Sequence, residues 1–238
     1  MGKVIIIASG KGGVGKTVFA VNTGAALAKK GRKVVLIDMN VGLRNLDLCM
    51  GLESKVIFDI ADVLSGVCKP KRALVRDKRF PCLYIMAAPQ KTEKFQARSE
   101  NVKALYENLR ESFDEIIVDG PAGVRGDLRL ASFRADMGIV VTTLDHVALR
   151  DADMVNSLMR EEDVRERAYV INKVNMNLMR TGCLPSFEDV SRTIKSQLLG
   201  IIQYDENIHL ASNCGYPIAF SHGNYIEENF GRIAERII

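Results

Sequence analysis

Residues 9–17 read Ser9-Gly10-Lys11-Gly12-Gly13-Val14-Gly15-Lys16-Thr17 and match the pattern G-x-x-x-x-G-K-[ST]. An apolar run typical of a buried strand precedes them at residues 4–8, and a helical pattern follows at residues 18–30. Glycines at these spacings let successive backbone amides converge on phosphate oxygens, and the helix N-terminus behind the loop adds positive potential. This stretch therefore predicts a nucleotide-phosphate site between the first strand and the first helix.

Two side chains of the loop have chemistry suited to a nucleoside triphosphate bound with magnesium. The Lys16 ammonium can neutralise the β- and γ-phosphates, and the Thr17 hydroxyl can complete the shell of Mg²⁺. Asp38 and Asp119 each come directly after an apolar run, where open α/β sheets bind their ligands. An aspartate in such a place also often caps the next helix. Because both runs end in the same way, we predict that the two carboxylates support the metal.

The remaining apolar runs alternate with helical patterns along the chain. This alternation predicts an α/β fold with a mainly parallel, twisted sheet and helices on both faces. No linker or repeat divides the chain, so we expect one domain over residues 1–238. The predicted strands cover residues 4–8, 33–37, 83–87, 115–118, 138–142, 168–171 and 198–202. The predicted helices cover residues 18–30, 101–113, 147–161 and 225–238.

Composition excludes several other classes of protein. The formal net charge of +4 is too small to indicate a nucleic-acid partner, and 47% apolar residues argue against disorder. No apolar run approaches the roughly 20 residues of a membrane-spanning helix. The five cysteines contain no Cys-x-x-Cys pair and the three histidines lack the spacing of metal ligands, so we expect reduced thiols and a cytoplasmic protein.

Lys11, a second lysine inside the loop, makes the sequence resemble the MinD/ParA family of deviant Walker A P-loop ATPases, with most similarity to its septum-placing branch. The resemblance implies ATP or ADP with Mg²⁺ as ligands, and an ATP-bound homodimer in which Lys11 reaches the partner's phosphates. The catalytic residues that it implies are Lys11, Lys16, Asp38, Asn40 and Asp119, and the metal ligands that it implies are Thr17, Asp38 and Asp119. The nucleotide-binding residues that it implies are Gly10, Lys11, Gly12, Gly13, Val14, Gly15, Lys16, Thr17, Val18 and Asn172.

Further stretches extend the resemblance over most of the chain. They are residues 34–38, 41–47, 118–123, 141–143, 150–153, 171–173 and 198–202. By this resemblance the Asn172 amide contacts adenine, and division inhibitors or activators of the MinC/MinE type bind near Asp151. An asparagine at a strand end is also a common turn residue, so this role of Asn172 is weighed against a structural one.

Three positions depart from the family pattern. Asn40 stands where the family usually has a second aspartate, and a neutral amide accepts a proton far less well than a carboxylate. We therefore expect slow hydrolysis. Val18 stands where the family has a hydroxyl residue that binds the α-phosphate, so we expect weaker binding of the nucleotide. Gly120 replaces a serine or threonine near the γ-phosphate, and we expect this change to have a minor effect.

The family attaches to membranes through a basic amphipathic segment, so membrane contact requires such a segment after Ile238. The stripe Ile226, Phe230, Ile233 and Ile237 fits better a helix packed on the sheet. A basic cluster made of Lys69, Lys71, Arg72, Arg76, Lys78 and Arg79 is either a solvated face or a patch for an acidic partner or anionic lipid.

These observations favour an ATP-dependent, dimerising ATPase that positions the division septum or another cell-surface assembly. Two alternatives stay open. One is an interaction module switched by ATP with negligible turnover, because of Asn40. The other is a flagellar-number or DNA-partitioning member of the same family, although we do not expect nucleic acid to be a partner.

Overall fold

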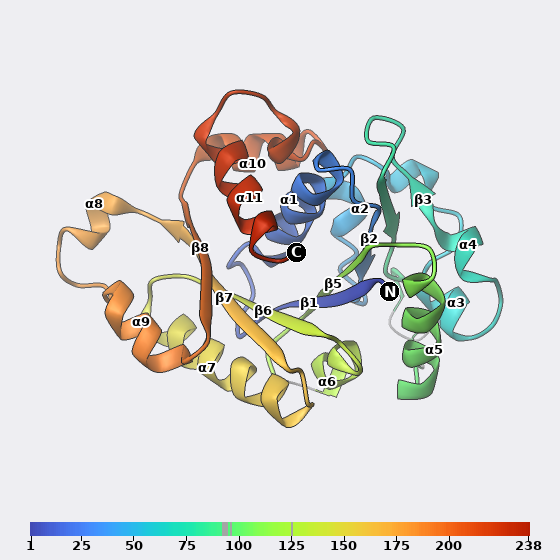
Figure 1. The fold of residues 1–238 in the computed structure, drawn as a ribbon, viewed down its shortest axis with the longest axis horizontal. Coiled ribbons are helices and arrows are strands. Elements are labelled where there is room, and N and C mark those ends of the chain that lie inside the picture. The colour runs from blue at the N-terminus through green and yellow to red at the C-terminus, as the bar shows by residue number, and fades with distance from the viewer. Residues whose placement is uncertain (92–94, 96, 125) are drawn as a thin grey trace.

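An eight-stranded sheet forms the centre of the computed structural model, in which residues 1–91, 95, 97–124 and 126–238 are described (Figure 1). The strand order is β3-β4-β2-β5-β1-β6-β7-β8. Among the described residues the strands pair in parallel, except that the edge strand β3 pairs antiparallel with β4. The strands are β1 (Lys3–Ser9), β2 (Val34–Asp38), β3 (Val75–Arg76), β4 (Leu83–Met86), β5 (Glu115–Ala122), β6 (Met137–Thr142), β7 (Glu166–Val174) and β8 (Gln197–Gln203).

Helices connect the strands as crossovers. The α-helices are α1 (Lys16–Lys29), α2 (Leu46–Cys49), α3 (Ile60–Leu64), α4 (Pro70–Ala73), α5 (Ser99–Arg110), α6 (Gly126–Ser132), α7 (His146–Glu161), α8 (Met176–Met179), α9 (Phe187–Ile194), α10 (Glu206–Asn213) and α11 (Tyr225–Glu235). In the part of the chain that the structure describes, short 3-10 helices cover Glu53–Lys55 and Ile218–Phe220.

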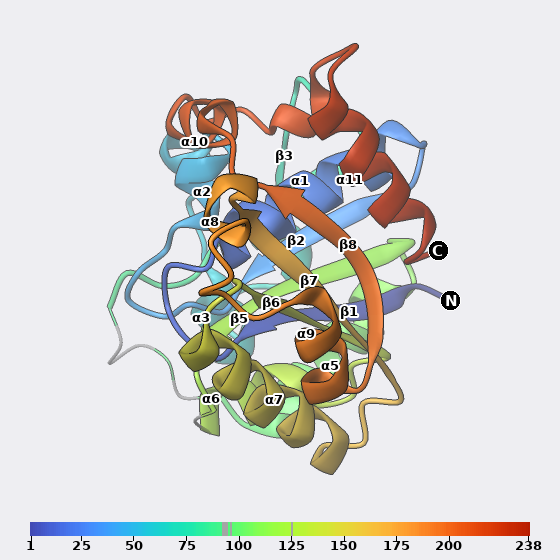
Figure 2. The ribbon, with the colours of Figure 1, turned by 90° about the vertical axis from the view of Figure 1, so that its left-hand side faces the viewer.

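The sheet separates two apolar cores, and alternate residues of β1 supply both. Val4 and Ile6 belong to the core under α5, α7 and α9, whereas Ile5 and Ile7 belong to the core under α1 and α11. Figure 2 shows α1 and α11 on one side of the sheet and α5, α6 and α7 on the other. Strands covered on both faces explain the continuous apolar runs in the sequence.

The predicted fold class, a mainly parallel α/β sheet with helices on both faces, is confirmed, and all seven predicted strands are present. Several details of the prediction were wrong, and they include the helices that it did not contain, namely α2, α3, α4, α6, α8, α9 and α10. β3 was missed because two residues carry no periodic pattern. β5 and β7 extend beyond their apolar runs, so Asp119 and Asn172 lie inside strands. The extent of the domain, residues 1–238, stays a prediction.

The C-terminal helix α11 packs against α1 and β8, as its stripe predicted. Ile226, Phe230, Ile233 and Ile237 are at most 4% exposed, which makes them core residues. Within the described part of the chain, no helix combines the length and the apolar character needed to cross a bilayer.

Candidate functional site

The glycine-rich loop joins the end of β1 to the start of α1. Gly13 and Gly15 have φ values of 81° and 92°, in the left-handed region that favours glycine. A Cβ on Gly10 would lie 2.3 Å from the Cβ of Asp151 in α7, so this position requires the absence of a side chain. Gly15 immediately precedes α1, a helix of 14 residues. The backbone amides of its first turn have no intrahelical acceptor, and the positive end of its dipole faces the loop. The loop thus has the form of an anion-binding cradle.

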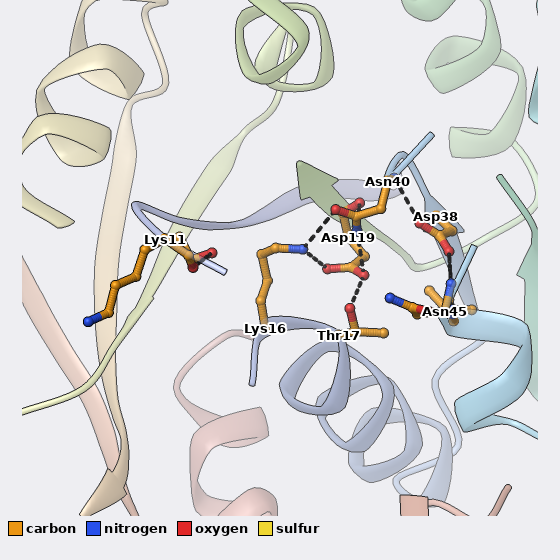
Figure 3. A network of polar contacts seen from close by, with 9 residues as sticks. Lys11, Lys16, Thr17, Asp38, Asn40, Asn45 and Asp119 are labelled. Atoms are coloured by element: carbon orange, nitrogen blue, oxygen red, sulfur yellow. Dashed lines mark hydrogen bonds and ion pairs between the residues drawn. The ribbon is translucent and has the colours of Figure 1, made fainter. Parts of the chain in front are cut away.

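Lys16 and Thr17 both contact Asp119 at the edge of this cradle (Figure 3). The Lys16 Nζ atom donates to Asp119 Oδ1 over 2.6 Å, and the Thr17 hydroxyl donates to Asp119 Oδ2 over 2.6 Å. Asp119 is fully buried and Lys16 is 7% exposed. The loop, the helix start and β5 therefore bring these three side chains together, as their positions in the sequence predicted.

Asp38 ends β2 directly beside Asp119, its partner in the parallel register. The Asp38 Oδ1 atom accepts a hydrogen bond from the backbone amide of Asn40 over 2.8 Å. Its Oδ2 atom accepts from the backbone amides of Asn45 and Leu46, each over 3.1 Å. The Asp38 carboxylate therefore also holds the loop between β2 and α2. Burial, followed by repulsion from Asp119, raises the pKa of Asp38 to about 7, although backbone amides and Lys16 oppose the shift.

We expect the Asp38 carboxyl to titrate near pH 7 in the nucleotide-free protein, measured by ¹³C NMR with Asp38→Asn as the assignment control. Because the folded pKa exceeds the unfolded one, the folded state binds more protons between about pH 4 and 7. Stability should therefore fall as pH rises through this window, by about 1.4 kcal/mol per unit of pKa shift. Titration near pH 4 would contradict this description of the site.

The charge balance of the cluster fits a divalent cation. Asp38 and Asp119 are two fully buried side chains, and Lys16 forms an ion pair with Asp119. Carboxylate and hydroxyl oxygens suit Mg²⁺, which commonly uses one or two carboxylates together with substrate phosphates. The described residues contain no group of three His, Cys, Asp or Glu side chains able to hold a metal. Phosphate oxygens and water molecules commonly supply the other ligands of Mg²⁺.

Asn40 joins the same cluster through its amide. Its Nδ2 donates to Asp119 Oδ2 over 2.9 Å, and its Oδ1 lies 3.4 Å from Lys16 Nζ. Gly120, another departure from the family pattern, fits tight packing on β1, because a Cβ there would lie 2.8 Å from Ile6 Cδ1 and 3.0 Å from the Ile7 carbonyl oxygen. Val18, also a departure, lies in the first turn of α1 and lines two cavities next to it.

Lys11 points away from this cluster (Figure 3) and pairs with Asp145, a residue that the sequence analysis missed. The Nζ atom lies 2.9 and 3.1 Å from the two Asp145 oxygens. Asp145 also caps α7 through the Ala148 amide and accepts from the Thr143 hydroxyl. Burial raises the pKa of Asp145, but these three donors outweigh it, so the pKa lies below its usual value.

The end of β7 closes the cradle from the side opposite to Asp119. Asn172 Nδ2 donates to the Val14 carbonyl over 2.8 Å, and Lys173 Nζ donates to the Gly13 carbonyl over 2.7 Å. Asn172 and Lys173 also line a cavity of about 340 Å³ together with Gly15, Val18, Gln203, Tyr204, Asp205, Ile208 and His209. Asn172 therefore forms a hydrogen bond that holds the loop, and it also lines the cavity beside the loop.

The structure places the two surface features that the sequence analysis singled out, while their roles stay predictions. Asp151 packs on Gly10, whereas Val147, Arg150 and Met154 are exposed residues of α7 nearby in the sequence. In the basic cluster, Arg79 pairs with Asp77 and donates to the carbonyls of Met50 and Gly215, so it is a structural residue. All members of the cluster are exposed, Arg79 included: Lys69, Lys71, Arg72, Arg76, Lys78 and Arg79.

Asp145 and Lys173 are the site residues that the sequence analysis missed. Asp145 meets Lys11 across 134 positions, and Lys173 meets Gly13 across 160. Neither contact has a local sequence signal. The one available clue was that Lys173 directly follows Asn172 at the carboxyl edge of the sheet, where α/β ligands bind.

Comparison with known proteins agrees with this geometry. Residues 5–218 match the family described as "CobQ/CobB/MinD/ParA nucleotide binding domain". The chain is 42% identical to the septum site-determining protein MinD of Bacillus subtilis, over 100% of this chain and 90% of that protein. Its fold matches MinD in the MinC:MinD cell division protein complex of Aquifex aeolicus with a TM-score of 0.90, 35% identity, and coverage of 99% and 95%. It also matches MinD from Pyrococcus horikoshii complexed with Mg-ADP, with a TM-score of 0.89, 26% identity, and coverage of 100% and 96%. The chain is therefore a MinD-type member of the CobQ/CobB/MinD/ParA nucleotide-binding family.

Proposed function

We propose that this protein is a MinD-type ATPase that binds ATP or ADP with Mg²⁺, dimerises with ATP and takes part in placing the division septum. The observation that carries the proposal is the buried contact of Lys16 and Thr17 with Asp119 beside the glycine-rich loop. The MinD relative complexed with Mg-ADP supports the choice of nucleotide and metal.

The residues of the site divide the work by their chemistry. Lys16 and the loop amides would hold the β- and γ-phosphates, with Gly10, Gly12, Gly13, Val14, Gly15 and Val18 forming the cradle around them. Thr17, Asp38 and Asp119 would hold Mg²⁺, which when bound neutralises charge on the phosphates. The Asn172 Oδ1 atom is left to contact adenine, since Nδ2 is bonded to the loop.

Lys11 would act across the dimer. Its partner Asp145 belongs to the same chain, and their side chains are 38% and 40% exposed. Ion pairs this exposed contribute at most about 1 kcal/mol, so a neighbouring triphosphate can replace Asp145 as the partner of Lys11. We therefore assign Lys11 to the phosphates of the second subunit in the ATP-bound dimer.

The relatives support a proposal about the partners of this protein, and its location is proposed beside it. The solved MinC:MinD complex supports a MinC-type division inhibitor as a partner, and we place its contact, and that of a MinE-type activator, on the exposed face of α7 near Asp151. We place the protein in the cytoplasm. Peripheral contact with the inner face of the cell membrane would require a basic amphipathic segment after Ile238.

Two measurements test the proposal. Calorimetry should show binding of ADP and ATP that depends on Mg²⁺ and is lost in Asp119→Asn, which removes a ligand and the partner of Lys16. Expression in Bacillus subtilis cells that lack their own MinD should restore the placement of division septa. Binding without restoration would limit the proposal to a nucleotide switch, and absence of binding would contradict it.

A further inference from the structure

The last residues of β7 have an unusual backbone. The register between β7 and β8 breaks between Ile171 and Val174, and Lys173 in this break has φ of +55°. A lysine rarely adopts this left-handed conformation, and such residues gather where function requires a particular geometry. Bulges of this kind redirect a side chain next to an active site. Here the redirected side chain reaches the glycine-rich loop.

Two neighbouring carbonyls of the loop are held by two neighbouring side chains of β7. Lys173 bonds the Gly13 carbonyl over 2.7 Å, and Asn172 bonds the Val14 carbonyl over 2.8 Å. A Cβ on Gly15 would lie 2.4 Å from Asn172 Nδ2, so the two segments are in direct contact.

The direction of each carbonyl decides where the next amide points. In a trans peptide, the C=O and N–H bonds lie in the same plane and point in opposite directions. No cis peptide occurs in the described residues, so holding the Gly13 carbonyl towards Lys173 turns the Val14 N–H the opposite way. The Val14 carbonyl and the Gly15 N–H are related in the same manner. Both amides are thereby turned away from β7.

We propose that Lys173 is a positioning residue that orients the Gly13–Val14 peptide group, so that the Val14 amide is ready to donate to a bound phosphate before the nucleotide arrives. The inference rests on the nucleotide site proposed above. Its energetic basis is pre-organisation, because a loop already held in its binding conformation loses less entropy when the ligand binds. The strained backbone at residue 173 is the structural consequence of placing this amine.

A different explanation would be simple attraction between the Lys173 ammonium and the phosphates. The two explanations predict that the loss of affinity in a Lys173 variant depends differently on the nucleotide and on the salt concentration. Attraction acts more strongly on ATP than on ADP and weakens as salt screens it. Orientation of a backbone amide affects ADP and ATP by the same factor and changes little with salt. This difference makes the inference testable with binding measurements.

The test compares Lys173→Asn with Lys195→Asn. Both lysines are exposed and have positive φ, but Lys195 ends α9 away from the loop. Asparagine tolerates this backbone conformation, so both variants should fold, as checked by thermal melting. We expect Lys173→Asn to weaken ADP and ATP equally, by about five-fold, in line with the loss of one partly exposed hydrogen bond. Lys195→Asn should bind like the parent, and Lys173→Arg should recover most of the loss.

A second readout does not depend on affinity. In ¹H–¹⁵N spectra without nucleotide, Lys173→Asn should shift the Val14 amide and speed its hydrogen exchange, while Lys195→Asn leaves it unchanged. Unaltered binding by Lys173→Asn, or a loss that is greater for ATP and disappears at high salt, would overturn the inference. If the parent chain binds neither nucleotide, the proposed function fails instead, and the amide spectra still report on the contact.

Discussion

Replacing Asn40 by aspartate should raise the rate of ATP hydrolysis by about 10²-fold, the lower end of what a positioned general base contributes. Asn40 lies in the cluster of Lys16 and Asp119, next to the expected γ-phosphate. Its amide can orient a water molecule but cannot readily accept a proton. A carboxylate at the same place can do both, so turnover should increase while nucleotide affinity changes less.

The same substitution should lower the stability of the nucleotide-free protein. The Asn40 Nδ2 atom now donates to Asp119, and an aspartate would set a third carboxylate against two buried ones. We expect a loss of about 1–3 kcal/mol, the range for losing a hydrogen bond to a charged group, although Thr17 still donates to the same Asp119 oxygen. Urea denaturation at pH 7 measures this loss. Asn40 thus favours the empty site at the expense of turnover.

Asn45→Asp is the matched control. Asn45 lies in the same loop and its backbone amide bonds Asp38, but its side chain makes no cap hydrogen bond. The Asn45→Asp substitution adds the same negative charge to the loop but leaves the contacts of Asn40 in place. Steady-state ATPase should rise in Asn40→Asp and stay at the parent level in Asn45→Asp. Equal rates in the parent and Asn40→Asp would show that Asn40 does not limit hydrolysis.

Removing the Lys11 side chain should abolish the ATP-dependent dimer at micromolar protein concentration. Each of the two phosphate contacts across the interface would lose a charged partner, so the dissociation constant of the dimer should rise by at least about ten-fold. Sedimentation velocity of Lys11→Ala with ATP measures this directly. The monomer should remain folded, because the ion pair that is lost is largely exposed.

Asp145→Asn separates the two partners of Lys11. Asparagine keeps an acceptor for the Ala148 amide and so preserves the cap of α7, but it no longer holds the lysine as a charged partner. We expect this variant to dimerise at lower ATP concentration than the parent. Dimerisation of Lys11→Ala like that of the parent would exclude a role for Lys11 across the interface.

Local sequence signals predicted much of the fold and the centre of the site. The glycine pattern, the apolar runs and the amphipathic stripe of α11 each lie within about a dozen residues, where periodicity and turn chemistry are informative. Lys16, Thr17, Asp38 and Asp119 could be found in this way, because the carboxyl ends of parallel strands meet at one edge of the sheet. Elements of two to five residues, such as β3 and α4, have too few residues for such a pattern.

The missed residues depend on tertiary structure. Asp145 resembles an ordinary helix cap in the sequence, and its contact with Lys11 exists only because β6 lies beside β1. Lys173 matters because its backbone is left-handed, a conformation that nothing in its sequence context requires. In both cases the chain brings together segments more than a hundred residues apart, which propensity and spacing do not describe.

The central claim is that ATP, and not ADP, joins two copies of this chain. Sedimentation velocity of the parent chain with Mg²⁺ and either nucleotide tests it most directly, and slow turnover by Asn40 should preserve ATP during the run. We predict a monomer with ADP and a dimer of about twice the 26.4 kDa chain mass with ATP. A monomer with both nucleotides, at concentrations that saturate binding, would contradict the claim.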